Sequence, residues 1–140
     1  MESKRRDDRG RRREADMRYR YEYNPTLSAA QVGELRETVG WDARIDKYQA
    51  ILGNTYLCVA CFYEDELVGY AGVVSDGVDD AYIRDLMVRP EHQHQGIASN
   101  LIAMIVETVK GDGIKMVGVL FAPSCADFFA GPDFILWQAA

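Results

Sequence analysis

Apolar and polar residues first alternate regularly at residues 19–23, where three tyrosines are separated by Arg and Glu (YRYEY). A period of two residues is typical of a half-exposed strand. Ser28 and Gln31 then form a capping box, because the Ser hydroxyl can accept the N3 amide while the Gln side chain reaches back. This pattern predicts a helix from Ser28 to about Val39, and Gly40 ends it.

A second helix is predicted at residues 41–53, since apolar residues recur at helical spacing at positions 45, 48, 51 and 52. Residues 55–63 (TYLCVACFY) are rich in β-branched and aromatic side chains. They are followed, after an acidic turn, by a second run of this kind at residues 67–75, and the two runs predict a β-hairpin. A third strand is predicted at residues 81–88, where Pro90 stops it.

The next helix is amphipathic: it starts after Gly96, places apolar residues on one side and ends at Gly111. A buried strand follows at residues 115–121 (KMVGVLF), and such a strand-helix-strand unit must be parallel and right-handed. A short helix at residues 123–129 and a last strand at residues 134–137 complete the order β-α-α-β-β-β-α-β-α-β. The sequence therefore predicts a single α/β (α+β) domain with a mixed sheet flanked by helices.

The composition is that of an ordinary soluble globular protein, with 48% apolar and 27% charged residues in a chain of 140. No apolar run approaches the roughly 20 residues needed to span a membrane, and the N-terminus has no apolar segment of a secretory signal. Cys58, Cys61 and Cys125 are too few, and odd in number, for a disulfide framework. We expect one cytoplasmic domain without disulfides or membrane contacts.

Charge is unevenly distributed along the chain. The first 20 residues hold nine Lys or Arg and five Asp or Glu, whereas the remainder holds seven and seventeen. Residues 1–16 also lack apolar periodicity, so they are expected to be a disordered tail before a folded domain at residues 17–140. The tail can stay solvated, or touch RNA or an acidic surface. The acidic domain is expected to repel nucleic acid and to favour amines as partners.

The loop between the strand at residues 81–88 and the amphipathic helix carries the main chemical signal. Gly96 and Ala98 leave little side chain over the helix N-terminus, where unpaired amides and the helix dipole favour phosphate. The spacing Gln93-x-x-Gly96-x-Ala98 is neither the P-loop pattern nor the dinucleotide motif. Small residues at this point also suit tight packing of the strand on the helix, so the spacing alone leaves both readings open.

Together with the preceding run Asp85-Leu-Met-Val-Arg-Pro-Glu91, this loop resembles the GCN5-related N-acetyltransferase (GNAT) superfamily, whose acetyl-CoA motif is Gln/Arg-x-x-Gly-x-Gly/Ala after such a strand. The resemblance covers roughly residues 17–138. It implies acetyl-CoA as co-substrate, with its pyrophosphate on the loop amides and its pantetheine arm paired along the strand. The implied binding residues are Met87, Val88, Gln93, His94, Gln95, Gly96, Ile97, Ala98 and Ser99.

The reaction implied by the resemblance is acetyl transfer to a primary amine of a small molecule or a protein. Such a site needs a proton acceptor for the amine and a donor for the oxyanion. The resemblance places the donor among the backbone amides around Leu86 and the base on a carboxylate of this strand, which is Asp85. Asp85 can equally be a structural acid paired with Arg84. Tyr82 is a further candidate as a lining residue or water holder, or it simply packs.

One position departs from the family pattern. Where family members commonly have a Tyr that protonates the departing thiolate, this chain has Phe129. Either the thiolate leaves unassisted or through water, as its modest pKa permits, or Ser124 or Cys125 donates the proton. The departure keeps a second hypothesis open, a non-catalytic acyl-CoA-binding sensor or interaction module. There is little sequence left for the last family strand, which a homodimer partner can supply.

Other candidate sites have weaker support. His92 and His94 have no third ligand at useful spacing, so no metal site is expected. Cys58 and Cys61 point to opposite faces of a strand, which argues against a redox or zinc pair. The tyrosines of residues 19–23 fit a sheet surface better than a base-stacking platform. A cationic acceptor amine is expected to meet Trp41, Asp42, Tyr48, Asp76, Asp79 and Asp80.

Overall fold

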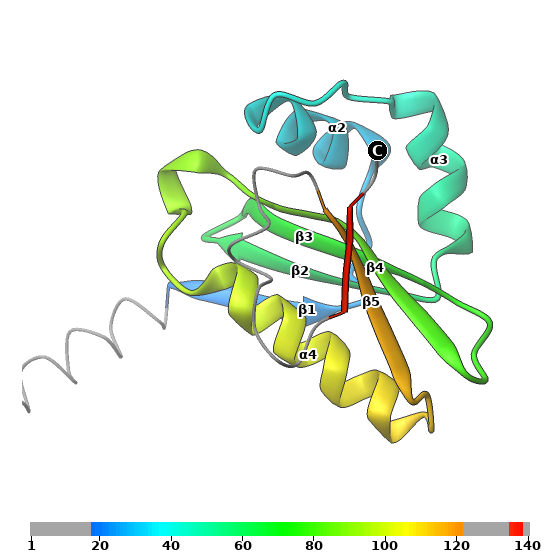
Figure 1. Ribbon diagram of the computed structural model, residues 1–140. Helices are drawn as coiled ribbons and strands as arrows, with labels where there is room; N and C mark the ends of the chain where they lie inside the picture. Colours follow the sequence, from blue (N-terminus) through cyan, green and yellow to red (C-terminus); the bar gives the residue numbers. More distant parts are fainter. Residues whose placement is uncertain (1–17, 122–134, 139–140) are drawn as a thin grey trace, which may run out of the picture.

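The computed structural model describes residues 18–121 and 135–138, which form a six-stranded sheet with helices packed on its faces (Figure 1). The strands lie across the sheet in their order along the chain, β1 to β6. The helices and strands follow the predicted order wherever the chain is described. They are β1 (Tyr19–Tyr23), α2 (Ala29–Thr38), α3 (Ile45–Asn54), β2 (Leu57–Tyr63), β3 (Glu66–Ser75), β4 (Asp80–Val88), the 3-10 turn η1 (Pro90–His92), α4 (Ile97–Gly111), β5 (Met116–Phe121) and β6 (Ile135–Gln138).

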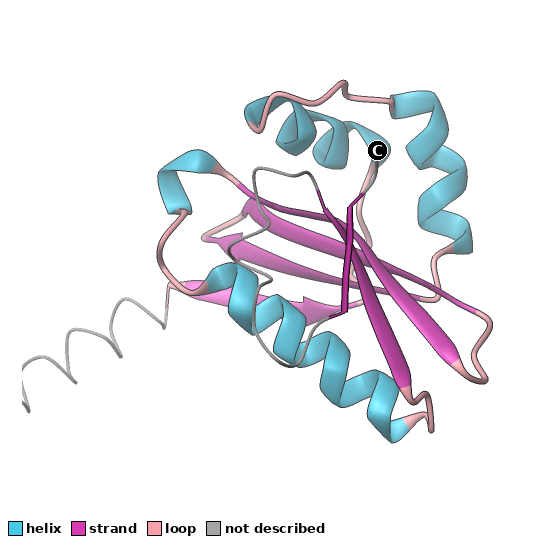
Figure 2. Ribbon diagram, viewed as in Figure 1, coloured by secondary structure: helices cyan, strands magenta, loops and turns pink. Residues whose placement is uncertain are grey.

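The sheet is mixed, as the sequence predicts. Strands β1 to β4 form an antiparallel meander, and β5 pairs in parallel with both β4 and β6. The predicted parallel unit of β4, α4 and β5 is therefore confirmed. The secondary-structure view separates this sheet from the helices that cover it (Figure 2).

Two apolar clusters cover opposite faces of the sheet. On one face α4 packs Leu101, Ile105 and Val109 on the central strands. On the other face α2 and α3 contribute Val32, Leu35 and Tyr48. Cys58 belongs to the α2–α3 cluster and Cys61 to the α4 cluster, so the prediction that these cysteines point to opposite faces is confirmed.

The predicted start of the second helix is wrong. Residues 41–44 are not helical, and α3 begins only at Ile45, after Arg44 with a left-handed φ of 52°. The physical reason lies in tertiary contacts, because the Arg36 side chain bonds the carbonyl of Asp42 and holds this connection open. Strand β2 likewise starts two residues later than expected, since the Thr55 hydroxyl donates to the Ile51 carbonyl at the end of α3. The predicted helix at residues 123–129 lies outside the described residues.

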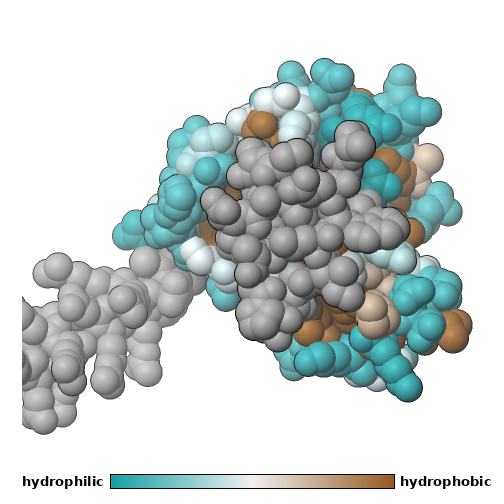
Figure 3. All heavy atoms as spheres, in the orientation of Figure 1, coloured by the Kyte–Doolittle hydropathy of each residue, from teal (hydrophilic) through white to brown (hydrophobic). Residues whose placement is uncertain are grey.

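Polar side chains dominate the described part of the surface seen in Figure 3, and apolar side chains show only in limited areas. The exposed large apolar residues include Val74, Val78, Tyr82 and Met116, near the ends of β3, β4 and β5. Within the described ranges, no helix is both long enough and apolar enough to cross a bilayer.

Candidate functional site

A β-bulge interrupts strand β4 next to the predicted acetyl-CoA loop. Tyr70 pairs with Met87 and Gly72 with Arg84, so two residues of β4, Asp85 and Leu86, lie opposite the single residue of β3 between them. Asp85 has a left-handed φ of 55°. A bulge of this kind bends its strand and re-aims the side chains around it. Here it turns the consecutive residues Arg84 and Asp85 toward each other, with 3.2 Å between Arg84 Nε and Asp85 Oδ2.

Strand β4 separates from β5 at the same point. Pairing between the two strands runs from Asp80 to Ile83, whereas β4 continues to Val88. The Arg89 amide donates to the Val68 carbonyl at 2.7 Å, so the N–H and C=O of Val88 point away from β3, toward the side that β5 has left. The Val88 carbonyl accepts a hydrogen bond from Gln93 Nε2 at 3.0 Å. The Val88 amide therefore faces the gap as a donor.

The side chains of Met87 and Val88 are buried, in the α2–α3 and α4 clusters respectively. Val88 can thus offer a ligand only its backbone, as a strand-like pairing with a pantetheine arm requires. The backbone of Met87 points the other way, toward its partner Tyr70 on β3. Leu86, the predicted oxyanion donor, is half-buried and packs its side chain against the α4 cluster.

The N-terminus of α4 presents free amides to solvent. Gly96 is the N-cap with a φ of 82°, no side chain caps the helix, and its first turn contains no acidic residue. A Cβ added to Gly96 would meet no atom of residues 18–121 or 135–138 within 4 Å, so this part of the chain leaves the space in front of the helix end open. The amides of the first turn have no intrahelical acceptor, and together with the helix dipole they favour an anion.

The other predicted loop residues surround this helix end. The side chains of Gln93, His94, Gln95 and Ser99 are exposed, and Ala98 is half-buried. Ile97 is buried in the α4 cluster and anchors the start of the helix on β3, so only its amide is available. The structure therefore brings together every loop residue that the sequence predicted.

Strand β1 supports this loop from outside, a contact that the sequence analysis missed. Tyr19 Oη lies 2.8 Å from Nδ1 of His92, on the turn η1 just before the loop. The His92 ring also packs on Tyr63, with 4.8 Å between ring centroids. His92 is thus part of an aromatic contact, and within residues 18–121 and 135–138 no group of three or more metal-ligating side chains forms.

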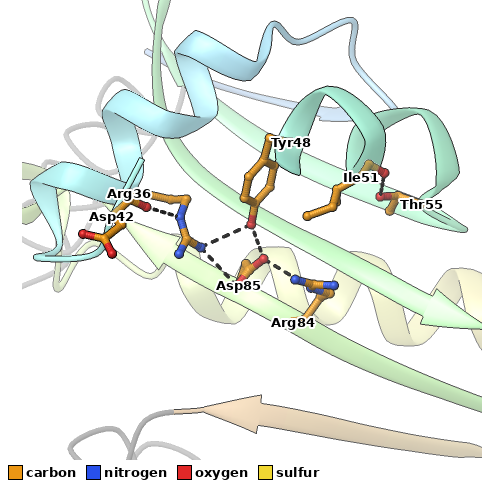
Figure 4. A network of polar contacts seen from close by, with 7 residues as sticks. All are labelled: Arg36, Asp42, Tyr48, Ile51, Thr55, Arg84 and Asp85. Carbon is orange, nitrogen blue, oxygen red and sulfur yellow. Dashed lines mark hydrogen bonds and ion pairs between the residues drawn. The ribbon is translucent and has the colours of Figure 1, made fainter. Parts of the chain in front are cut away.

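The Asp85 carboxylate is surrounded by three polar side chains from three elements, as Figure 4 shows. Oδ1 lies 3.4 Å from Nη1 of Arg36 on α2, and Oδ2 accepts hydrogen bonds from the Tyr48 hydroxyl on α3 and from Arg84 Nε. Arg36 also bonds the Tyr48 hydroxyl at 3.3 Å. We call these four residues, Arg36, Tyr48, Arg84 and Asp85, the Asp85 cluster.

Arg36 and Tyr48 of the Asp85 cluster are shielded from water, whereas the side chains of Asp85 and Arg84 are partly exposed. Arg36 is 6% exposed and Tyr48 is fully buried. Burial raises the pKa of the Tyr48 hydroxyl to about 12, and its hydrogen bond to Asp85 acts in the same direction. Tyr48 is therefore a neutral donor at physiological pH. The expectation that it meets an acceptor amine is wrong, because its hydroxyl is already engaged inside the domain.

These contacts bear on the two roles considered for Asp85. The Asp85 carboxylate accepts hydrogen bonds from Tyr48 and Arg84 and faces Arg36, so three side chains of the fold already occupy it. The geometry therefore favours the structural role for Asp85. The sequence analysis missed Arg36. An arginine on the apolar face of a predicted helix, directly after Leu35, was a sign that this side chain has a buried partner.

The remaining candidates have distinct positions. Tyr82 is 41% exposed, and its ring lies over Gly118 of β5, at the edge of the gap between the two strands. Asp76 accepts backbone hydrogen bonds from Val78 and Asp79, so its carboxylate shapes the β3–β4 turn. Trp41 faces the guanidinium of Arg36 at 5.2 Å. The thiolate-donor candidates Ser124 and Cys125, and Phe129 itself, lie outside the described residues.

Comparisons with known proteins agree with this geometry. The model of the acetyltransferase (GNAT) family matches residues 14–127. The uncharacterized N-acetyltransferase ycf52 of Gracilaria tenuistipitata var. liui is 26% identical over 118 residues, which cover 81% of this chain and 65% of that relative. The chain thus spans slightly less than two thirds of the relative's length.

Two solved structures illustrate the similarity in fold. A Staphylococcus aureus protein, SA2161, described as a probable acetyltransferase, superposes with a TM-score of 0.72 at 17% identity, over 87% of this chain and 98% of that one. An aminoglycoside 6'-N-acetyltransferase complexed with coenzyme A gives a TM-score of 0.62 at 18% identity, over 71% of this chain and 60% of that one. At these identities the similarity shows the fold alone.

Proposed function

The chain belongs to the GNAT family of acetyltransferases, and from this premise we propose that it transfers the acetyl group of acetyl-CoA to a primary amine of a small molecule or a protein. The observation that carries the proposal is the uncapped N-terminus of α4 beside the gap between β4 and β5. The complex of a fold neighbour with coenzyme A supports the same co-substrate.

The proposed placement of acetyl-CoA uses backbone groups. Its pyrophosphate would lie on the amides between Gln93 and Ser99, where the helix dipole and open space at Gly96 favour negative charge. Its pantetheine arm would follow β4 and take hydrogen bonds from the unpaired edge, including the Val88 amide that faces the gap.

The chemistry then needs a donor at the thioester. The neutral amine attacks the thioester carbon and a tetrahedral oxyanion forms. The C–S bond then breaks to release the CoA thiolate, and the amine nitrogen loses a proton to water, from which the thiolate takes one. The backbone amide of Leu86 is the proposed oxyanion donor, because the bulge places it where β4 is no longer paired with β5. Tyr82, exposed at the edge of the gap, is the proposed lining residue on the acceptor side.

The role of Asp85 can be decided with Asp85→Asn. If Asp85 accepts the amine proton, turnover should fall by about 10²–10⁴ while CoA affinity stays at the wild-type level. If Asp85 is structural, stability and CoA affinity should fall together, since the amide weakens the contacts to Arg36 and Arg84.

The proposal is tested first by thermal unfolding with CoA. A ligand that binds only the native state raises the melting temperature, so CoA should raise Tm of the wild-type chain. Gly96→Glu should abolish this rise, because it places a carboxylate in front of the α4 amides. Gly113→Glu is the matched control: Gly113 lies at the other end of α4, with a similar φ of 84° and open space around it. An equal CoA response in both variants would refute the loop assignment.

Phe129 keeps the alternative, a non-catalytic acyl-CoA-binding module, in view. The two functions differ in turnover and not in CoA binding. Incubation of the purified protein with acetyl-CoA and a panel of primary amines, with detection of free thiol, separates them. Thiol release that depends on an amine supports the enzyme, whereas CoA binding without release for any amine supports the module.

A further inference from the structure

Asp85 adopts a backbone conformation that its side chain does not favour. Its φ of 55° lies in the left-handed region, where residues with a Cβ are strained and glycine is not. Asp is among the residues that tolerate this region best, but it still needs contacts that hold it there. The position lies inside a strand, at the bulge where β4 leaves β5.

Contacts from the helices on one face of the sheet supply that support. Arg36 of α2 and Tyr48 of α3 both reach the Asp85 carboxylate, and they bond to each other (Figure 4). Their positions are fixed in turn. Arg36 Nε donates to the Asp42 carbonyl at 2.6 Å, and the Tyr48 ring packs edge-on against Tyr70 of β3.

This support is directed at the backbone that the proposed function uses. The residues after Asp85 are Leu86, Met87 and Val88, whose backbone is free of β5. If residue 85 returned to an extended conformation, the bulge would be lost and the register of every following residue of β4 would change by one. The Val88 amide would then no longer face the gap.

We propose that Arg36 and Tyr48 are positioning residues that hold Asp85 in the left-handed conformation and thereby keep strand β4 bent away from β5 for acetyl-CoA. The link to acetyl-CoA rests on the function proposed above, whereas the effect on the strand does not. Helices α2 and α3 thus control the geometry of the acetyl-CoA strand, although they lie on the opposite face of the sheet from α4.

The first test compares Asp85→Gly with Asp85→Ala. Both variants remove the carboxylate and deprive the same arginines of their ion-pair partner, but only glycine accepts a positive φ without strain. Asp85→Gly should therefore unfold at the higher urea concentration, and it should bind CoA about tenfold more tightly than Asp85→Ala, as titration calorimetry would measure. Equal urea midpoints and equal affinities would overturn the proposal. If Arg36 without its ion-pair partner prevents folding, Arg36→Met is added to both variants and the same comparison applies.

The second test asks whether Tyr48 acts through Asp85. Tyr48→Phe keeps the ring on Tyr70 and removes only the hydroxyl, so it should weaken CoA binding about three- to tenfold in the wild-type chain. The same substitution should change affinity less than about twofold in the Asp85→Gly chain, because the bulge no longer needs the contact. Tyr70→Phe is the matched control, since Tyr70 is buried in the same apolar cluster as Tyr48 but its hydroxyl is not hydrogen-bonded to Asp85 in the described part of the structure. Its affinity should stay at the wild-type value.

The outcomes separate the two proposals. A wild-type chain that does not bind CoA refutes the proposed function, and the urea midpoints of the same variants then decide the positioning role. A wild-type chain that binds CoA, with equal effects of Tyr48→Phe in both backgrounds, overturns the positioning role and leaves the function standing.

Discussion

Gly69 of β3 lies directly under the first turn of α4, and replacing it by alanine should disturb both stability and the predicted acetyl-CoA loop. A Cβ at this position would lie 2.9 Å from Ile97 Cγ2 and 3.3 Å from Leu101 Cδ1. Optimal carbon contacts are about 3.5–4.0 Å, so Ile97 must withdraw by roughly 0.6–1.1 Å. Overpacking of this kind costs about 1–3 kcal/mol, which corresponds to a loss of about 3–15 °C in Tm for a chain of this size.

The assay is thermal and urea unfolding of Gly69→Ala with and without CoA. Because Ile97 directly follows the N-cap Gly96, a shift of the helix start should also weaken CoA binding several-fold. Gly53→Ala is the matched control, since a Cβ there meets nothing within 4 Å and the position is inside α3. It should leave CoA affinity unchanged and raise stability by up to about 1 kcal/mol.

A double variant identifies the contact. Ile97→Ala removes the atom that the new methyl group would meet, so its cost and that of Gly69→Ala should not add in the combined variant. Additive losses, or a Gly69→Ala variant that melts with the wild type, would refute this account of the β3–α4 contact.

Three further predictions concern other parts of the chain. Burial raises the pKa of Tyr48 to about 12 and that of Cys61 to about 11, so the native state keeps these protons longer than the unfolded state does. The free energy of unfolding should therefore keep its full value below about pH 8 and fall as the pH rises toward 12. Tyr48→Phe should reduce the accompanying fall in the urea midpoint. A urea midpoint that does not change with pH would contradict this. Arg89→Lys should lower stability by about 1–2 kcal/mol in urea unfolding, because lysine cannot reproduce the paired bonds of Arg89 to Glu34, and an unchanged midpoint would count against it. Deletion of residues 2–16 should leave Tm and CoA affinity unchanged, and a large loss of Tm would place the domain boundary earlier.

Much of the fold could be predicted because a helix or strand with one buried side shows apolar residues at the period of that element. The alternation at residues 19–23, the apolar strands and the amphipathic α4 all appear in the structure with the predicted order and pairing. Local chemistry also located some ends, since the capping box of Ser28 and Gln31 forms as expected. The ends of helices that depend on side chains elsewhere in the chain were predicted at the wrong residues. Residues 41–44 are an example, because Arg36 donates a hydrogen bond to the Asp42 carbonyl there.

The open helix entry proposed to bind acetyl-CoA was predictable for the same local reason. Gly96 is needed where the backbone takes a positive φ, and the amides at a helix start have no partner whatever the rest of the fold does. Its support by Tyr19 on β1 was not predictable, because residues 19 and 92 meet only through the successive pairing of four strands, β1 to β4.

The sequence by itself determined the order of elements, the mixed sheet and the small-residue helix entry, because each depends on residues close together in the chain. Only the tertiary structure decided what the Asp85 carboxylate contacts. Arg36 and Tyr48 lie 49 and 37 residues away along the chain and meet it because α2 and α3 pack on one face of the sheet. Contacts between residues so far apart along the chain exist only once the sheet has formed. The bulge in β4, which the strand register shows, brings the carboxylate to Arg36 and Tyr48.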